Sequence, residues 1–180
     1  IIIGFTNGPC NYGPSRKLTG QPKEVFAIMN YAVDDNERPI FYKKVVETVV
    51  HEFCHSFTKI KGDTEKALEK SGKALQEYTY FSMRRQAYST WRNILEESLV
   101  RAATICYLID HDYDEKDIRN AIIEQVDRNF FWMPELVQTL RYYESHRKKY
   151  PTFTSFYPEI IRFFDRYVTN MEKEMKKAMK

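Results

Sequence analysis

The segment that most constrains this chain is residues 49–55, Val-Val-His-Glu-Phe-Cys-His, in which two histidines lie four positions apart. In a helix, residues i and i+4 share one face about 5–6 Å apart, so His51 and His55 can reach one metal ion at about 2.0–2.1 Å. Glu52 would then lie beside the water that the metal activates. The pattern is typical of helical zinc sites and predicts a helix here.

The surrounding residues predict one amphipathic helix over 41–60. Six apolar residues at helical spacing form its expected buried stripe: Val46, Val49, Val50, Phe53, Phe57 and Ile60. His51 and His55 fall nearly opposite this stripe at about 100° per residue, so they face away from the core, as a ligand pair must. The alternative is a pair of ordinary histidines on a solvated face, with Glu52 as an accidental neighbour. Cys54 lies nearer the stripe and is expected to pack rather than bind metal.

Composition predicts one domain that folds without disulfides. The chain has 180 residues, 43% hydrophobic and 15% aromatic, which is enough to bury one sizeable core. Three widely spaced cysteines, Cys10, Cys54 and Cys106, argue against a disulfide framework and a cysteine-based zinc site. The net charge of +3 is small and its basic residues are dispersed, so no nucleic-acid partner is expected. No apolar stretch approaches the ~20 residues of a membrane span, and no signal peptide is visible.

The first forty residues differ in character from the remainder. Glycine and proline are frequent in 1–40, where strands are predicted over 1–6 and 24–33 and a turn at 34–36. From residue 41 onward the pattern is almost entirely helical. Further helices are predicted over about 63–87, 88–109, 114–128 and 134–149, with a last helix that Pro158 opens.

These patterns predict an α+β, mostly helical fold, in which a small N-terminal sheet packs on a helical body. One domain is expected over 1–180, with a strand and loop part over 1–40 and a helical part over 41–180. Because the chain begins without methionine, we expect it to be a piece excised from a longer protein.

A third ligand is expected from another segment, because a catalytic zinc usually has three protein ligands and one open position. His111 and His146 are candidates, and Glu96 and Glu97 in the helix over 88–109 are stronger ones. That helix is expected to bury Leu95, Leu99, Ala102, Cys106 and Ile109. Glu97 lies across from this stripe whereas Glu96 flanks it, so the criterion applied to the histidines favours Glu97. The alternative is that both glutamates are solvated.

A His-Glu-x-x-His helix followed by a glutamate-donating helix resembles the gluzincins, a class of zinc metallopeptidases. The resemblance implies a zincin-like fold, in which His51, His55 and Glu97 bind Zn²⁺ and Glu52 is the general base. Arg101, four residues after Glu97, departs from the acidic residue usual there in several gluzincin families. It could hold Glu97, bind the substrate or make a surface ion pair.

Thr58 and Lys61 stand where metzincins have glycine and histidine, which excludes that class. Three further stretches, 11–15, 97–102 and 143–158, resemble an uncharacterised bacterial family described as a domain of unknown function with a predicted peptidase core. They span most of the chain. This second resemblance also implies a zincin-like fold and an exported bacterial protein.

A developing oxyanion needs a hydrogen-bond donor besides the metal. Tyr157 is the expected donor, and Tyr150 and His146 are alternatives from the same late aromatic segment. Because the chain has thirteen tyrosines, packing is the competing interpretation for each. Residues 8–13 could lie beside the cleft and offer backbone groups to an extended peptide, or they could form a surface loop.

The leading hypothesis is a zinc-dependent hydrolase that cleaves peptide bonds in a peptide or protein, with Glu52 and Tyr157 as catalytic residues. One alternative is a zincin-like binding or structural module without activity, and another is a zinc hydrolase of non-peptide amides. The presence of Glu52 weighs against the first alternative, because a structural zinc site needs no base. Two imidazoles and one carboxylate suit zinc, although iron, cobalt or nickel would accept the same ligands.

Overall fold

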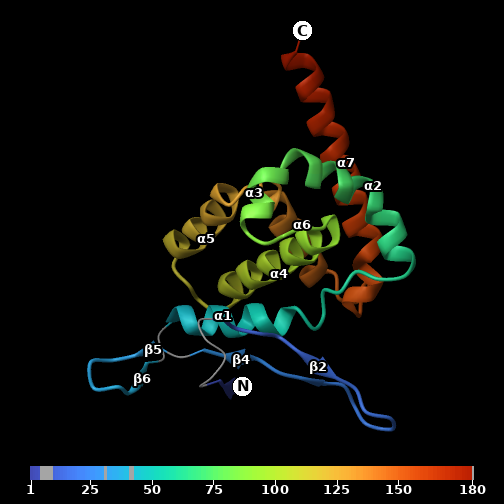
Figure 1. Cartoon of the computed structure of the whole chain (residues 1–180). Coiled ribbons are helices and arrows are strands. Elements are labelled where there is room, and N and C mark those ends of the chain that lie inside the picture. Colours follow the sequence, from blue (N-terminus) through green and yellow to red (C-terminus); the bar gives the residue numbers. More distant parts are fainter. Residues whose placement is uncertain (5–9, 31, 41–42, 180) are drawn as a thin grey trace. The chain divides into compact units, whose positions relative to one another are not determined.

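The computed structural model describes residues 1–4, 10–30, 32–40 and 43–179. The chain divides into two compact units, Ile1–Lys59 and Ile60–Lys180. The first unit contains the short strands and one helix, and the second contains the remaining helices (Figure 1). The predicted α+β, mostly helical class is therefore confirmed. The first unit ends at Lys59, so the helix that carries His51 belongs with the strands.

Three pairs of two-residue strands make up the described β-structure of the first unit. The first pair is parallel, the other two are antiparallel, and their members are β1 (Ile2–Ile3) with β4 (Ile28–Met29), β2 (Ser15–Arg16) with β3 (Glu24–Val25), and β5 (Ala32–Val33) with β6 (Pro39–Ile40). In the first pair Ile2 lies opposite Ile28. Residues 5 and 6 of the predicted first strand lie outside the described residues.

The predicted turn at 34–36 is confirmed. Oδ1 of Asp34 accepts hydrogen bonds from the backbone N–H groups of Asn36 and Arg38, each at 2.9 Å. An aspartate that binds backbone amides a few residues ahead stabilises a tight turn, which here joins β5 to β6.

Residues 11–13 connect the strands to the helix of the first unit. Tyr12 exchanges two backbone hydrogen bonds with Ile28, at 2.8 and 2.9 Å, on the edge of β4 that faces away from β1. Gly13 then approaches the backbone of Glu52 so closely that a Cβ on Gly13 would lie 1.8 Å from the Glu52 carbonyl oxygen. Only glycine fits this contact, which fixes the segment against the helix.

That helix, α1, runs over Lys43–Cys54 and is shorter than predicted. Beyond it, Ser56 N–H donates to the carbonyl of Phe53 at 3.1 Å, and the Thr58 hydroxyl donates to the carbonyl of Cys54 at 3.1 Å. The first of these bonds spans three residues rather than four, so the helix ends in a tighter turn, and the threonine hydroxyl satisfies one of its last carbonyls. His55 is therefore the first residue after α1.

Part of the predicted apolar stripe is wrong, both within α1 and beyond its end. Val46 and Phe57 are 44% and 61% exposed, whereas Val49, Val50 and Phe53 are partly buried. Ile60 is buried, but it belongs to the core of the second unit rather than to α1.

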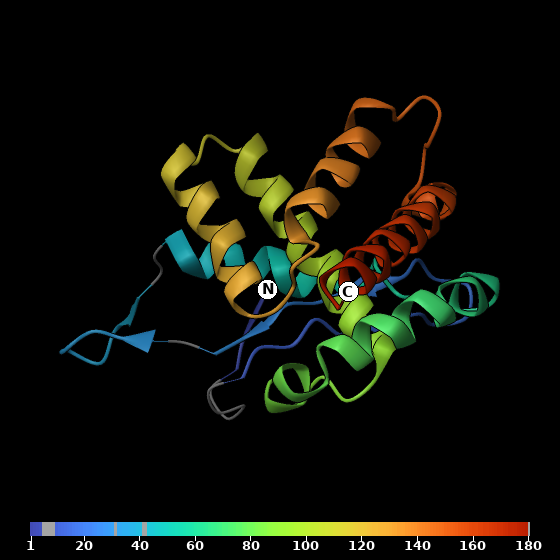
Figure 2. The same ribbon diagram turned by 90° about the horizontal axis from the view of Figure 1, so that it is seen from above.

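Six helices form the described part of the second unit: α2 (Asp63–Tyr78), α3 (Tyr80–Arg85), α4 (Trp91–Asp110), α5 (Glu115–Asp127), α6 (Met133–Ser145) and α7 (Phe153–Ala178). α4 packs against α2, α5 and α6, and α7 packs against α2 and α6 (Figure 2). The predicted helix over 63–87 is two helices, because the chain breaks at Thr79. The Thr79 hydroxyl donates to the carbonyl of Leu75 at 2.7 Å.

The prediction that Pro158 opens the last helix is wrong. α7 begins at Phe153, where Thr152 and Ser155 form a capping box through hydrogen bonds of 3.2 and 3.3 Å. This cap and the burial of Phe156 stabilise an earlier start, although Pro158 then lacks one helical hydrogen bond.

The core of the second unit is built around α4. Leu95, Leu99, Ala102 and Cys106 are buried as predicted, and Ile109 packs at the edge of the same cluster. Within the described part of the chain, no helix combines the length and the apolar character that crossing a bilayer requires.

Replacing Gly13 with alanine is expected to destabilise the protein by about 1–3 kcal/mol, because the new methyl group would overlap the Glu52 carbonyl. Urea unfolding followed by circular dichroism measures the loss. Gly20→Asn is a suitable control, since nothing lies within 4 Å of the place that a Cβ would take there and asparagine tolerates the local φ of 76°. An equal loss in both variants would contradict the close contact at Gly13.

Candidate metal centre

The first unit brings His51 and His55 together. His51 lies in the last turn of α1 and His55 directly follows it, yet the i,i+4 spacing is kept because the chain continues into a turn. The two ring centroids lie 5.0 Å apart with the ring planes at 83°. Both side chains are partly exposed. The pair therefore has the proximity that the sequence predicted.

Glu52 is buried, with 8% of its surface exposed. It follows His51 in the last turn of α1, and its backbone carbonyl is the group against which Gly13 packs. The glycine-rich composition of the N-terminal segment was the only sequence signal for this contact. The close contact with Gly13 restrains the helix at the position of the proposed base.

Glu97 is a buried carboxylate on α4. Its Oε1 lies 2.8 Å from Nη2 of Arg101, one helical turn later, and the two side chains are 8% and 10% exposed. Of the three roles predicted for Arg101, the structure therefore supports the one in which it holds Glu97. The alternative in which both glutamates are solvated is wrong.

Glu96, next to Glu97 in the chain, contacts a different part of the second unit from the one that Glu97 contacts. Its Oε1 accepts a hydrogen bond of 2.9 Å from the backbone N–H of Ile60, the first residue of that unit. This bond is a structural use for Glu96, because it attaches the beginning of the unit to α4.

Tyr157, the predicted oxyanion donor, is buried in the core of the second unit and packs edge-on against Phe153, with ring centroids 5.4 Å apart. Burial, and secondly the charge of Glu96, raise the pKa of Tyr157 well above its usual value. Tyr150, the alternative donor, donates its hydroxyl to Glu159. The catalytic role of Tyr157 stays a prediction.

The alternative histidine ligands, His111 and His146, occupy equivalent positions at helix ends. His111 follows α4 and stacks on Tyr107, with ring centroids 3.7 Å apart. His146 follows α6 and lies against Tyr142, with ring centroids 3.9 Å apart. Nδ1 of each ring contacts the backbone carbonyl of that same tyrosine. These contacts indicate helix-terminal packing for both histidines.

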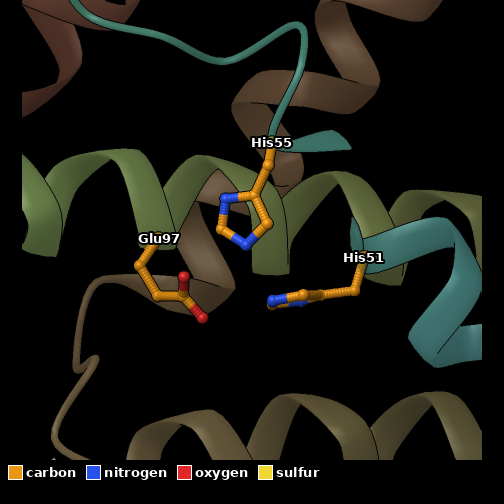
Figure 3. A group of neighbouring side chains, drawn as sticks. All are labelled: His51, His55 and Glu97. Atoms are coloured by element: carbon orange, nitrogen blue, oxygen red, sulfur yellow. The ribbon is translucent and has the colours of Figure 1, made fainter. Parts of the chain in front are cut away.

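The predicted ligands His51, His55 and Glu97 each contribute a potential ligand atom to one group, and these atoms lie within 4.8 Å of one another. Figure 3 shows the two imidazole rings and the carboxylate directed toward one another. The group includes neither Glu96 nor the two alternative histidines.

The family described as "Domain of unknown function (DUF4932)" matches residues 2–163. The chain belongs to the DUF4932 family. The match includes all three stretches that resembled a domain of unknown function, as well as every candidate site residue. Neither the curated proteins nor the solved structures contain a match.

The stability of the DUF4932 domain is expected to depend on the Tyr157 hydroxyl at alkaline pH. Because the pKa of Tyr157 is raised on folding, its contribution is fully present below pH ~10, the unfolded value, and is lost as the pH rises above it. The loss for this one group approaches about 1.4 kcal/mol per pH unit.

Urea unfolding at stepped pH above ~10 measures this dependence. The free energy of unfolding should fall less steeply with pH in Tyr157→Phe than in the unaltered domain. Identical slopes would mean that the hydroxyl has the same acidity in the folded and unfolded states.

Proposed function

We propose that this domain is a zinc-dependent hydrolase of gluzincin type that cleaves peptide bonds. The observation that carries the proposal is the group formed by His51, His55 and Glu97, whose potential ligand atoms lie within 4.8 Å of one another. The ligand atoms of a tetrahedral zinc ion lie about 3.4 Å apart, which falls within this limit.

The chemistry of these ligands also supports zinc. Two imidazoles and one carboxylate make up three protein ligands, which leaves a fourth position open, as catalytic zinc sites require. Iron, cobalt or nickel accept the same ligands, so the preference for zinc is one of ligand type. A zinc ion bound here supplies a Lewis acid that polarises a carbonyl and lowers the pKa of water toward ~7.

Glu52 is the proposed general base. It directly follows His51 in the chain, and the packing of Gly13 against its backbone restrains its position. A carboxylate in this position can take a proton from the attacking water and pass it to the leaving amine. A site that served only to stabilise the fold would need the two histidines but not this base.

Tyr157 is the proposed donor to the developing oxyanion. A tyrosine hydroxyl keeps its proton throughout the physiological range and can therefore donate such a hydrogen bond. The proposed substrate is a peptide or protein, and the small net charge of +3 gives no reason to expect nucleic acid.

Metal content tests the proposed ligands. After reconstitution with zinc and removal of the excess, mass spectrometry should find about one zinc per chain in the unaltered domain. His51→Ala and Glu97→Gln should lose it, because each removes a strong ligand. Glu96→Gln is the matched control and should keep it, since a glutamine oxygen can still accept the hydrogen bond from Ile60.

Circular dichroism shows whether each variant is folded. If Glu97→Gln kept zinc at full occupancy, the assignment of Glu97 as the third ligand would be wrong. If the unaltered domain held no metal after reconstitution, the hydrolase proposal would fail.

Activity is tested on parallel libraries of peptides and non-peptide amides. Glu52→Gln should retain zinc but cleave peptides at least about 100-fold more slowly, because loss of a general base typically costs 10²–10⁴-fold in rate. If the domain cleaved only non-peptide amides, its proposed substrate class would change from peptides to those amides. A domain that holds zinc but cleaves neither library would be a binding module.

A further inference from the structure

Arg101 is held from several sides within the second unit. Its Nη2 lies 2.8 Å from Oε1 of Glu97 and donates to the hydroxyl of Tyr88 at 3.0 Å. Its Nη1 donates to Oε1 of Gln125 at 2.6 Å, and its Cζ lies 5.1 Å from the centre of the Phe130 ring. The neighbours come from the segment before α4, from α5 and from the residues after α5.

An exposed ion pair between Arg92 of α4 and Glu65 of α2 shows how much Arg101 differs from an ordinary surface arginine. Arg92 lies 2.7 Å from Glu65, but these side chains are 49% and 31% exposed. The side chains of Arg101 and Glu97 are only 10% and 8% exposed. Removing a guanidinium from water is costly, and hydrogen bonds and an aromatic face must compensate for it.

These contacts fix the plane of the guanidinium. Because its two terminal nitrogens are bound to Glu97, Tyr88 and Gln125, the group cannot rotate without losing a buried hydrogen bond. The carboxylate of Glu97 is consequently held through Oε1. A carboxylate has two oxygens, so Oε2 can bind a second positive partner while Oε1 stays on Arg101.

We propose that Arg101 is a positioning residue of the metal centre, which binds Oε1 of Glu97 so that Oε2 is presented to the metal. The inference rests on the proposed function and adds the way in which its third ligand is oriented. Outer partners of metal ligands commonly contribute about 10–100-fold to metal affinity. Gln125 takes part indirectly, because it orients the guanidinium, whereas Tyr88 binds the guanidinium and also makes a side-chain hydrogen bond to Glu97 itself.

The test compares Arg101→Met and Arg101→Lys with Arg92→Met in the whole chain. Arg92→Met is the matched control, because it removes another arginine of α4 from its glutamate partner, but at an exposed site. Zinc affinity is measured by competition with a chelator, and the visible absorption spectrum is recorded at saturating Co²⁺. The spectrum reports ligand geometry, which a purely structural ion pair would not alter.

Arg101→Met is expected to weaken zinc binding about 10–100-fold and to change the cobalt spectrum. Arg101→Lys should lose less zinc affinity than Arg101→Met, because lysine keeps the positive charge. Some loss is still expected, because lysine lacks the planar guanidinium that binds several partners at once. Arg92→Met should change neither measurement. If Arg101→Met fails to fold, Gln125→Ala replaces it, with a smaller loss of affinity expected, and an unchanged affinity in that variant would overturn the inference.

Different results would contradict the role of Arg101 and the proposed function. Unchanged affinity and spectrum in a folded Arg101→Met, in a domain whose zinc still depends on His51 and Glu97, would overturn the role of Arg101 alone. If the unaltered domain bound neither zinc nor cobalt, the proposed function and this inference would fall together.

Discussion

The buried ion pair between Glu97 and Arg101 sets the strictest requirement on the second unit. Breaking a buried pair by removing one partner typically costs about 3–5 kcal/mol, because the remaining charge is left without compensation. Tyr88, Gln125 and Phe130 supply part of that compensation through the end of the guanidinium, whereas its buried Nε has no hydrogen-bond partner among the described residues. The packing of α5 and of the residues that flank it is thus coupled to one carboxylate on α4.

Ser98 and Glu96 on the same helix also have hydrogen-bond partners. Ser98, fully buried on α4, donates its hydroxyl to the carbonyl of Ile94 at 2.7 Å and accepts from the indole N–H of Trp132 at 2.9 Å. Glu96 accepts from the amide of Ile60. Three consecutive polar residues therefore serve separate purposes, which explains how a helix buried on most sides tolerates the sequence Glu-Glu-Ser.

In the first unit, the comparable constraint is the backbone contact between Gly13 and Glu52. It holds the N-terminal segment against the last turn of α1, where the proposed base lies between the two histidines. The periodicity of residues 41–60 correctly predicted α1 but not its end. The helix ends in a tighter turn, in which the backbone N–H of Ser56 donates to Phe53 and the Thr58 hydroxyl donates to Cys54. A hydrophobic pattern does not register such local hydrogen bonds. The outward-facing side chain of Phe57 follows from that turn.

Sequence by itself determined the parts of this protein that depend on local spacing. The proximity of His51 and His55 follows from the i,i+4 geometry, the core face of α4 from its apolar period, and the hairpin turn from Asp34. Only the tertiary structure decided which groups Glu96 and Glu97 contact and which residues surround Arg101. Those contacts join residues up to 36 positions apart, such as Glu96 and Ile60. Periodicity can assign a side chain to a face of a helix, but its partner there depends on which other segment packs against that face.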